Sequence, residues 1–365
     1  MAQSSMFSNF RQTLPSRNRY TFDIHNIDLA LVNAVRRIIL TNIPVVGFDG
    51  EINPTLQVLR NDGPLHNEFM LHRFGLIPIF FNEDETENFM SDDYMFELDV
   101  ENKTSLSLNV TTHHFNVYKD ETRQLPQKEV LRLFPADSIT KHPILITRLR
   151  PGEGLHVRGR AIKSSAQYHA GFSPVSLCTM SFIGGGDDLT TTHTTPLDKE
   201  RSYAKNKYGD PTHIQFEIET ETALVPKYLV SKSFDIIMQK LHKVLEEIHK
   251  DDSEFVHLDM KSEGHTTSVQ VTFQNEDDTL GNFLQSSMHN HYIRDKKPTV
   301  KNIGVSYVGY CCPHPLESIM ILSIHFASES ITITQDDIVS TLKEHCERVI
   351  MHVQNVQVEW NKNAI

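Results

Sequence analysis

Side chains that could bind a metal ion or act as nucleophiles are common in this chain, but few have the spacing that catalysis requires. Gly184, Gly185 and Gly186 are followed by Asp187 and Asp188 rather than by the Lys-Ser/Thr pair of a phosphate-binding loop. Negative charge at these positions would repel a phosphate group. The aspartate pair leaves a metal-dependent hydrolase open as one alternative, although an exposed acidic loop is the simpler interpretation.

The 20 histidines and four cysteines also raise the question of a metal site. No HExxH motif occurs, and His113 and His114 would point to opposite faces of a strand. Cys311, Cys312 and His314 offer ligands, but adjacent cysteines chelate a zinc ion poorly compared with spaced pairs. No GxSxG elbow presents a serine nucleophile. We therefore expect no catalytic residue, no metal site and no cofactor.

Composition indicates a soluble globular protein of a reducing compartment. The 365 residues are 39% hydrophobic and 22% charged, which suffices for two or three domains with buried cores. A net charge of -12 disfavours non-specific binding to a phosphate backbone. The cysteines include no CxxC pair, which argues against a disulfide framework. Because no run approaches the roughly 20 apolar residues of a membrane span, we expect an intracellular protein without membrane contact.

Apolar periodicity predicts regular elements at both ends of the first half. We expect a strand at 19–24 and an amphipathic helix at 26–41. A strand at 214–218 then precedes a long helix at 226–249, whose first residue is a proline suited to a first helical turn. Residues 167–210 are rich in turn formers, so long loops are predicted there.

The second half shows a similar pattern. Strands are predicted at 269–273, 302–307 and 319–326, where apolar and polar residues alternate. One helix is predicted to begin near residue 278, and another is predicted at 335–356.

The two halves repeat one plan once residues 51–212 are set aside. Each half contains a strand followed by an amphipathic helix, and each ends with a strand and a long helix. Leu31 and Asn33 align with Leu280 and Asn282 near the starts of the two shorter helices. This agreement indicates an internal duplication, and hence a built-in dimer of the kind that scaffolds use.

Charged residues beside apolar ones suggest protein contacts in two places. Arg36 and Arg37 follow the buried face of the first helix. Two solvated charges are the simpler interpretation, and a donor pair for a partner's carboxylates is the functional one. The second place is the segment 66–73, which is either a helical turn with an apolar face or a docking surface. Its polar members are His66, Glu68, His72 and Arg73.

Several of these segments carry a resemblance to a known family. They are residues 33–40, 66–78, 149–152, 169–175, 278–284, 309–310 and 313–317. The first half closely resembles the alpha-like subunits of cellular RNA polymerases, namely the third-largest subunit of RNA polymerase II and the archaeal D subunit. The second half resembles the eleventh subunit and archaeal L. The resemblance covers most of residues 18–357, and the fusion is similar to the arrangement in some large DNA viruses of eukaryotes.

The resemblance implies an α+β fold. Two alpha-like dimerisation units would form an intramolecular pseudo-dimer, with a mostly β insert domain in the first unit. The implied divisions are an N-terminal extension at 1–17, a first unit at 18–50 and 213–250, an inserted domain at 51–212, and a second unit at 251–365. Many relatives carry a cysteine-rich metal site in the insert. Residues 79–165 of this chain, where that site would lie, contain no cysteine, so no metal is carried over.

The resemblance also implies a function, that of a non-catalytic assembly-platform subunit of a DNA-directed RNA polymerase. Arg36 and Arg37 would contact the second-largest subunit. The segment 66–73, with His169 and Phe172, would face that subunit or the small zinc-binding subunits. The pseudo-dimer interface would comprise Leu31, Asn33, Val35, Leu280, Asn282 and Leu284.

The same resemblance sets the remaining expectations. The platform would hold the largest and second-largest polymerase subunits, with little or no direct nucleic acid contact and no homo-oligomer. It would work in the cytoplasm or nucleus, or in the host cytoplasm and virion if the chain is viral. Two alternatives stay open: a free dimeric adaptor of the same fold, and a metal-dependent hydrolase that uses Asp187 and Asp188.

Overall fold

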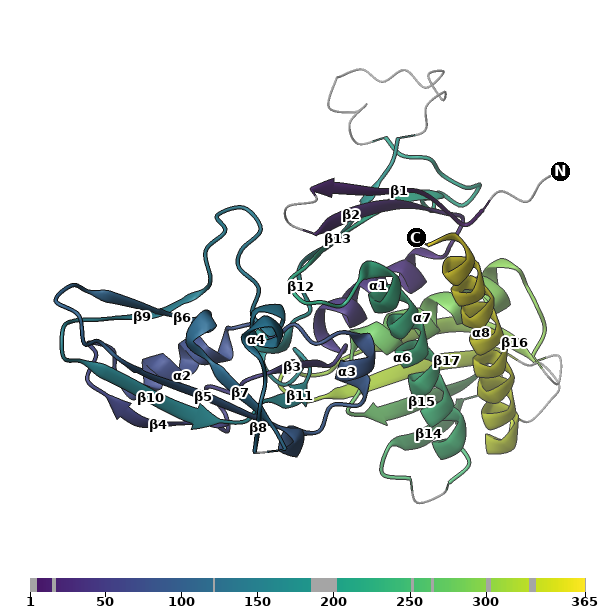
Figure 1. The fold of residues 1–365 in the computed structure, drawn as a ribbon. Helices are drawn as coiled ribbons and strands as arrows, with labels where there is room; N and C mark the ends of the chain where they lie inside the picture. The colour runs from purple at the N-terminus through teal and green to yellow at the C-terminus, as the bar shows by residue number, and fades with distance from the viewer. Residues whose placement is uncertain are drawn as a thin grey trace.

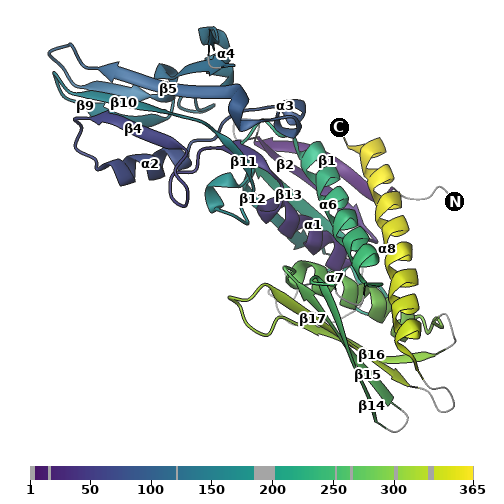
Figure 2. The ribbon, with the colours of Figure 1, turned by 90° about the horizontal axis from the view of Figure 1, so that it is seen from below.

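The computed structural model describes most of the chain. The described residues are 5–14, 18–120, 122–184, 202–250, 253–263, 266–299, 303–327 and 333–364. Asp187 and Asp188 lie outside them. Figure 2 shows the insert, the helices of the first unit and the sheet of the second unit in succession. The α+β pseudo-dimer expected from the sequence is confirmed, as is its strand-rich insert.

The first unit is a four-stranded antiparallel sheet with two helices. The strand order is β1-β2-β13-β12. In chain order, the elements are β1 (Phe7–Leu14), β2 (Arg19–His25), α1 (Leu29–Thr41), β12 (Val175–Phe182), β13 (His213–Thr220) and α6 (Pro226–Glu247). Phe22, Phe216 and Ile218 point from the sheet into the core that the helices cover.

The second unit repeats this topology strand for strand. Its sheet has the order β14-β15-β17-β16. In both units, the first, second, fourth and third strands along the chain lie side by side in that order. Its elements are β14 (Val256–Glu263), β15 (Thr266–Gln274), α7 (Asp278–Met288), the π-helical η5 (His289–Arg294), β16 (Gly304–Cys311), β17 (Ile319–Ala327) and α8 (Gln335–Asn363). The equivalence supports the predicted duplication more fully than the sequence pattern did.

Two strands of the first sheet differ from the sequence expectation. The residues of β1 were predicted to belong to an N-terminal extension, and those of β12 to a long loop within the insert. Both are edge strands with several exposed side chains. Edge strands satisfy half of their backbone groups through one neighbour and need no continuous apolar face, so their sequence signal is weak.

Helix ends follow local chemistry. Asp28 caps α1, where its carboxylate accepts a hydrogen bond from the Ala30 amide at 2.7 Å. Pro226 opens α6, as predicted. Thr334 and Asp337 form a capping box at the start of α8, which continues to Asn363 rather than ending near residue 356. The additional turns are stabilised by packing against the first unit.

The insert follows α1 and has its own apolar core. Its main sheet has the order β4-β10-β5-β7-β8, and Figure 1 shows it projecting away from the second unit. Its strands are β3 (Val45–Gly47), β4 (Leu56–Asn61), β5 (Tyr94–Glu101), β6 (Leu108–Thr111), β7 (Asn116–Lys119), β8 (Arg123–Gln124), β9 (Leu145–Leu149), β10 (Gly154–Gly159) and β11 (Ile162–Ser164). Its helices are α2 (Asn67–Gly75), α3 (Glu83–Glu87), η2 (Ser91–Asp93), η3 (Thr112–His114), α4 (Gln127–Leu133) and η4 (Ala170–Phe172).

The apolar interior divides differently from the predicted domains. One continuous core runs through both four-stranded sheets and the helices α1, α6, α7 and α8. A second core fills the insert between Val46 and Ala161. Because the two units share a single core, neither buries its apolar face alone. Across the described residues, no helix has both the length and the apolar character needed to cross a membrane.

Candidate functional site

The helices α1 and α7 form an antiparallel pair that joins the two units. Asp28, the N-cap of α1, accepts hydrogen bonds from Ser286 Oγ at 3.2 Å and from Asn290 Nδ2 at 2.7 Å. Asp277, the N-cap of α7, accepts one from Arg37 Nη2 at 3.3 Å. Arg37 follows Asp28 by nine residues, and Ser286 follows Asp277 by the same interval. The contacts are therefore reciprocal, as in a two-fold symmetric dimer.

The apolar residues predicted for the pseudo-dimer interface lie between these two polar ends. Each buried leucine there stabilises the joined units by about 1.5–3 kcal/mol relative to exposure. The structure buries Leu31, Val35, Leu280 and Leu284 in the shared core, and leaves Asn33 and Asn282 half-buried at its margin.

The two adjacent arginines have different surroundings. Arg37 donates from Nε to Thr279 Oγ1 at 2.8 Å and also pairs with Asp277, so it acts across the α1–α7 interface. Arg36 donates from Nε to Asn33 Oδ1 at 3.0 Å and, among the described residues, pairs with no acidic side chain. Of the two residues predicted to bind a partner, only Arg36 keeps its charge free for one.

The α2 surface is the second candidate for partner contact. It comprises the exposed side chains of His66, Glu68, Phe69, His72, Arg73 and Leu76. Phe69 is 62% exposed and Leu76 is 56% exposed, and their spacing of seven residues places them on one side of the helix. Arg73 is held in place by the Leu145 and Ile146 carbonyl oxygens, at 2.8 and 3.0 Å. Exposed apolar side chains with a polar rim are typical of a protein-binding surface.

Three glycines attach α2 to neighbouring segments. A side chain at Gly50 would collide with the Leu71 carbonyl of α2, and one at Gly75 would lie 3.1 Å from the Gly50 amide. At Gly171, a Cβ would lie 2.7 Å from the Gly75 carbonyl oxygen. The loop at 49–55, α2 and η4 therefore pack with their backbones in direct contact at these glycines. This contact brings the predicted segments 66–73 and 169–172 together.

The loop at 49–55 is organised by one buried carboxylate. Asp49 accepts hydrogen bonds from the Glu51, Ile52 and Asn53 amides, each at 3.0 Å, and from the Tyr168 hydroxyl at 2.7 Å. Burial alone would raise the pKa of Asp49, but these hydrogen bonds outweigh it and hold the pKa below its usual value. Asp49 was not among the residues predicted from the sequence, although the pair Asp49-Gly50 is a turn signal.

The last two predicted partner residues differ in accessibility. His169 is half-buried, and its Nε2 lies 2.9 Å from Glu51 Oε2 while Nδ1 accepts a hydrogen bond from the Gly171 amide. Phe172 is only 1% exposed and packs against Gly47 in the core. It supports the η4 segment from within, so a direct contact between its ring and a partner is not available in this conformation.

Cys311, Cys312 and His314 were weighed as metal ligands from the sequence, which predicted no site there, and within the described residues these three form no group of close ligand atoms. Cys312 donates to Asp278 Oδ1 at 3.5 Å, and His314 Nδ1 accepts a hydrogen bond from the Leu316 amide. Burial raises the pKa of the Cys312 thiol to about 11, which disfavours the thiolate that zinc requires. Within the described ranges, close ligand atoms come together in one group, Asp23, His25 and His213.

Comparison with known proteins gives two matches to one family description. Models described as the RNA polymerase Rpb3/Rpb11 dimerisation domain match residues 21–241 and, separately, residues 268–359. The human DNA-directed RNA polymerases I and III subunit RPAC1 is 24% identical over 309 residues, which cover 67% of this chain and 86% of that subunit. The mouse subunit of that name is 30% identical over 200 residues, covering 50% of this chain and 56% of the subunit. RPB3 of RNA polymerase II from Schizosaccharomyces pombe is 24% identical over 270 residues, which cover 65% of this chain and 86% of that subunit.

Proposed function

The chain belongs to the RNA polymerase Rpb3/Rpb11 dimerisation-domain family, and from this premise we propose that it is the assembly platform of a multisubunit DNA-directed RNA polymerase. Its relatives are non-catalytic polymerase subunits, so catalysis would belong to its partners. The observation that carries the proposal is the reciprocal α1–α7 interface. It unites two family domains of one chain into a pseudo-dimer with a single core.

The α2 surface and Arg36 are the proposed docking points for the second-largest subunit. Phe69 and Leu76 supply apolar area that a partner could bury, and His72 and Arg73 supply hydrogen-bond donors at its edge. Arg36 supplies a planar cation that could pair with a partner's carboxylate. The second-largest subunit is the proposed partner of these residues, and the segment around His169 would face that subunit or the small zinc-binding ones.

Fusion of the two units changes how the platform forms. Two separate chains would have to find each other, whereas here the second unit is tethered at an effective concentration of roughly millimolar. The two units are also made in equal amounts. We place the working platform in the nucleus or cytoplasm. For a chain of viral origin, the host cytoplasm and the virion are the proposed locations.

The test is affinity purification of the tagged full chain from its native source at moderate salt, followed by mass spectrometry. Co-recovery of two very large subunits at equal stoichiometry would support the platform. Recovery of the chain without them would refute it and favour a free dimeric adaptor of the same fold. The hydrolase alternative rests on Asp187 and Asp188, which lie outside the described residues.

A further inference from the structure

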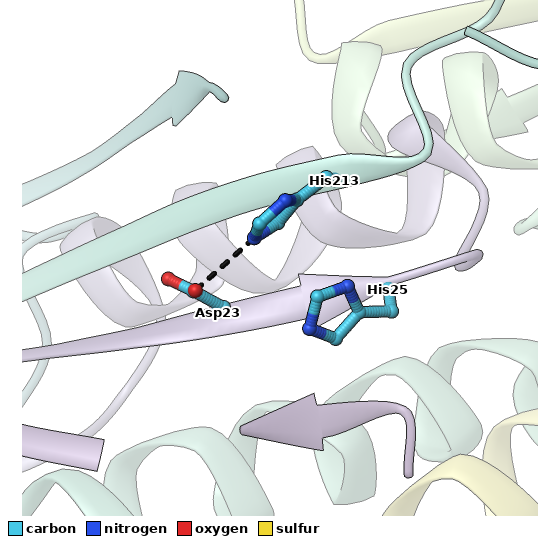
Figure 3. Close-up of side chains that lie close together, drawn as sticks. All are labelled: Asp23, His25 and His213. Atoms are coloured by element: carbon cyan, nitrogen blue, oxygen red, sulfur yellow. Dashed lines mark hydrogen bonds and ion pairs between the residues drawn. The ribbon is translucent and has the colours of Figure 1, made fainter. Parts of the chain in front are cut away.

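Three metal-capable side chains meet on the sheet of the first unit. Asp23 and His25 are two residues apart on β2, so both project from the same face of the strand. His213 pairs with His25 in the register of β2 and β13. Phe22 and Ile24 point into the core, so the three polar side chains lie on the opposite face of the sheet. Figure 3 shows them side by side on the two strands.

Their spacing is close to that of ligands around one ion. Asp23 Oδ2 lies 3.1 Å from His213 Nε2, and the two imidazole rings have centroids 4.4 Å apart. One ligand atom from each of the three residues lies within 4.8 Å of the other two. Ligands bound tetrahedrally to zinc at about 2.0–2.2 Å are roughly 3.3–3.5 Å apart. The 3.1 Å between Asp23 Oδ2 and His213 Nε2 is already close to this separation.

The carboxylate is buried and only partly satisfied. Asp23 is 5% exposed, and its Oδ1 accepts no hydrogen bond of normal geometry. Gln215 lies opposite Asp23 on β13 but makes no hydrogen bond of normal geometry to that oxygen. A buried carboxylate oxygen without a partner is unfavourable unless a cation or donor reaches it. A divalent ion bound by the carboxylate would offset part of this cost.

Neighbouring groups hold the side chains in orientations that suit a ligand set. Asn9 Nδ2 donates to Asp23 Oδ2 at 2.7 Å, and Ser8 Oγ lies 2.8 Å from His25 Nε2. The β1–β2 register is irregular after Ser8, and Asn9 adopts a φ of 54°, in the left-handed region. Such bulges redirect side chains in a strand.

We propose that Asp23, His25 and His213 bind one zinc ion, with a fourth position open to water or to a partner's side chain. Two imidazoles and one carboxylate suit zinc among the divalent ions. The ligands come from β2 and β13, and Asp23 and His213 are 190 residues apart in the chain. The ion would therefore fasten together two adjacent strands that the insert separates in sequence. It would also stabilise the folded chain, because the unfolded chain has no such preformed site.

The test uses the full chain after removal of metals with a chelator. Isothermal titration with Zn²⁺ alone should give one site per chain, and added Zn²⁺ should raise the unfolding temperature. His213→Gln and His25→Gln keep side-chain volume and polarity but remove a ligand. Each should weaken zinc binding by more than the 10–100-fold expected for loss of an outer-shell group. Circular dichroism of the metal-free variants checks that the fold is intact.

Matched variants identify where the ion binds. His156 pairs with Glu97 at 3.0 Å on another sheet, so His156→Gln removes a similar pair that lacks a third ligand. It should bind zinc as the wild type does, as should the double variant Cys311→Ser and Cys312→Ser. With Co²⁺ in place of zinc, the spectrum should lack a thiolate charge-transfer band. Absence of stoichiometric binding, or binding that survives both His25→Gln and His213→Gln, would overturn the site.

Discussion

The α1–α7 interface and the α2 surface both combine charged and apolar side chains, but their exposure is opposite. At the interface, leucines are buried and the charges of Asp28, Asp277 and Arg37 are used within the chain. On the α2 surface, Phe69 and Leu76 are more than half exposed. Residue type alone therefore does not separate an internal interface from an external one. Burial and reciprocal contacts between the two helices identify the internal interface.

The largest effect should come from a cavity at the internal interface. Leu284→Ala should destabilise the chain by about 2–5 kcal/mol, because Leu284 is 1% exposed in the core shared by both units. Leu76→Ala removes the same atoms from the α2 surface and should change stability by less than about 0.5 kcal/mol. Urea unfolding of both variants measures the difference. If Leu284→Ala and Leu76→Ala destabilised the chain equally, the two regions would not differ in their contribution to folding.

Substitutions on the α2 surface should reduce partner binding rather than stability. The double variant Phe69→Asp and Leu76→Asp should keep its unfolding midpoint but lose about 2 kcal/mol or more of affinity for the second-largest subunit, roughly 30-fold. Quantitative mass spectrometry of captured partners measures this. Leu106→Asp is the control, since Leu106 is 76% exposed elsewhere on the insert. If both variants reduce capture equally, the α2 surface has no special role.

Asp49 provides a pH-dependent test of the loop that adjoins the α2 surface. Its pKa is lower in the folded chain, so it stabilises the fold above its unfolded pKa of about 3.9. This stabilisation is lost as the pH falls through the folded-state pKa. Asp49→Asn should cost about 1–3 kcal/mol at pH 7, and the difference from wild type should shrink below about pH 4.

Urea unfolding across a pH series measures the Asp49 effect. Asp99→Asn, at an exposed position on β5, is its control and should change stability little at any of these pH values. A cost for Asp49→Asn that does not depend on pH would show that the charge of Asp49 does not stabilise the loop.

The smallest effect should separate the two adjacent arginines. Arg37→Ala should cost less than about 1 kcal/mol, because the side chains of its pair with Asp277 are 36% and 52% exposed and solvent weakens their attraction. Arg36→Glu should leave stability nearly unchanged and reduce capture of the second-largest subunit. The free energy of unfolding and the amount of captured second-largest subunit are both measured for Arg37→Ala and for Arg36→Glu. Reduced capture by Arg37→Ala with normal capture by Arg36→Glu would reverse the assignment.

Local patterns explain why much of the fold could be predicted. The helices α1, α6, α7 and α8 carry strong apolar periodicity, and Asp28 and Pro226 mark two of their starts. The duplication was visible because Leu31 and Leu280 occupy equivalent positions. The edge strands β1 and β12 escaped detection because pairing with one neighbour, rather than an apolar pattern, stabilises them.

Contacts between distant residues explain why the site was predicted only in part. Arg37 and Asp277 are 240 residues apart, so nothing near Arg37 in the sequence shows that its charge is used internally. Asp23 and His213 are similarly distant, and no spacing rule would group them. Phe172 shows the reverse case. Its segment has a motif suited to contact, yet the aromatic ring is buried in the core.

The last helix has a consequence for the order in which the chain folds during synthesis. Trp360 lies near the end of α8, yet its ring packs on Phe7 and Phe22 of the first sheet, with centroids 5.1 and 4.8 Å away. Its Nε1 donates to the Lys227 carbonyl oxygen at 3.0 Å. A ribosome makes Phe7 and Phe22 long before Trp360, so the nascent first unit keeps apolar surface exposed until α8 emerges. A prematurely terminated chain would present that surface to chaperones and proteases, and only chains that include α8 would enter assembly.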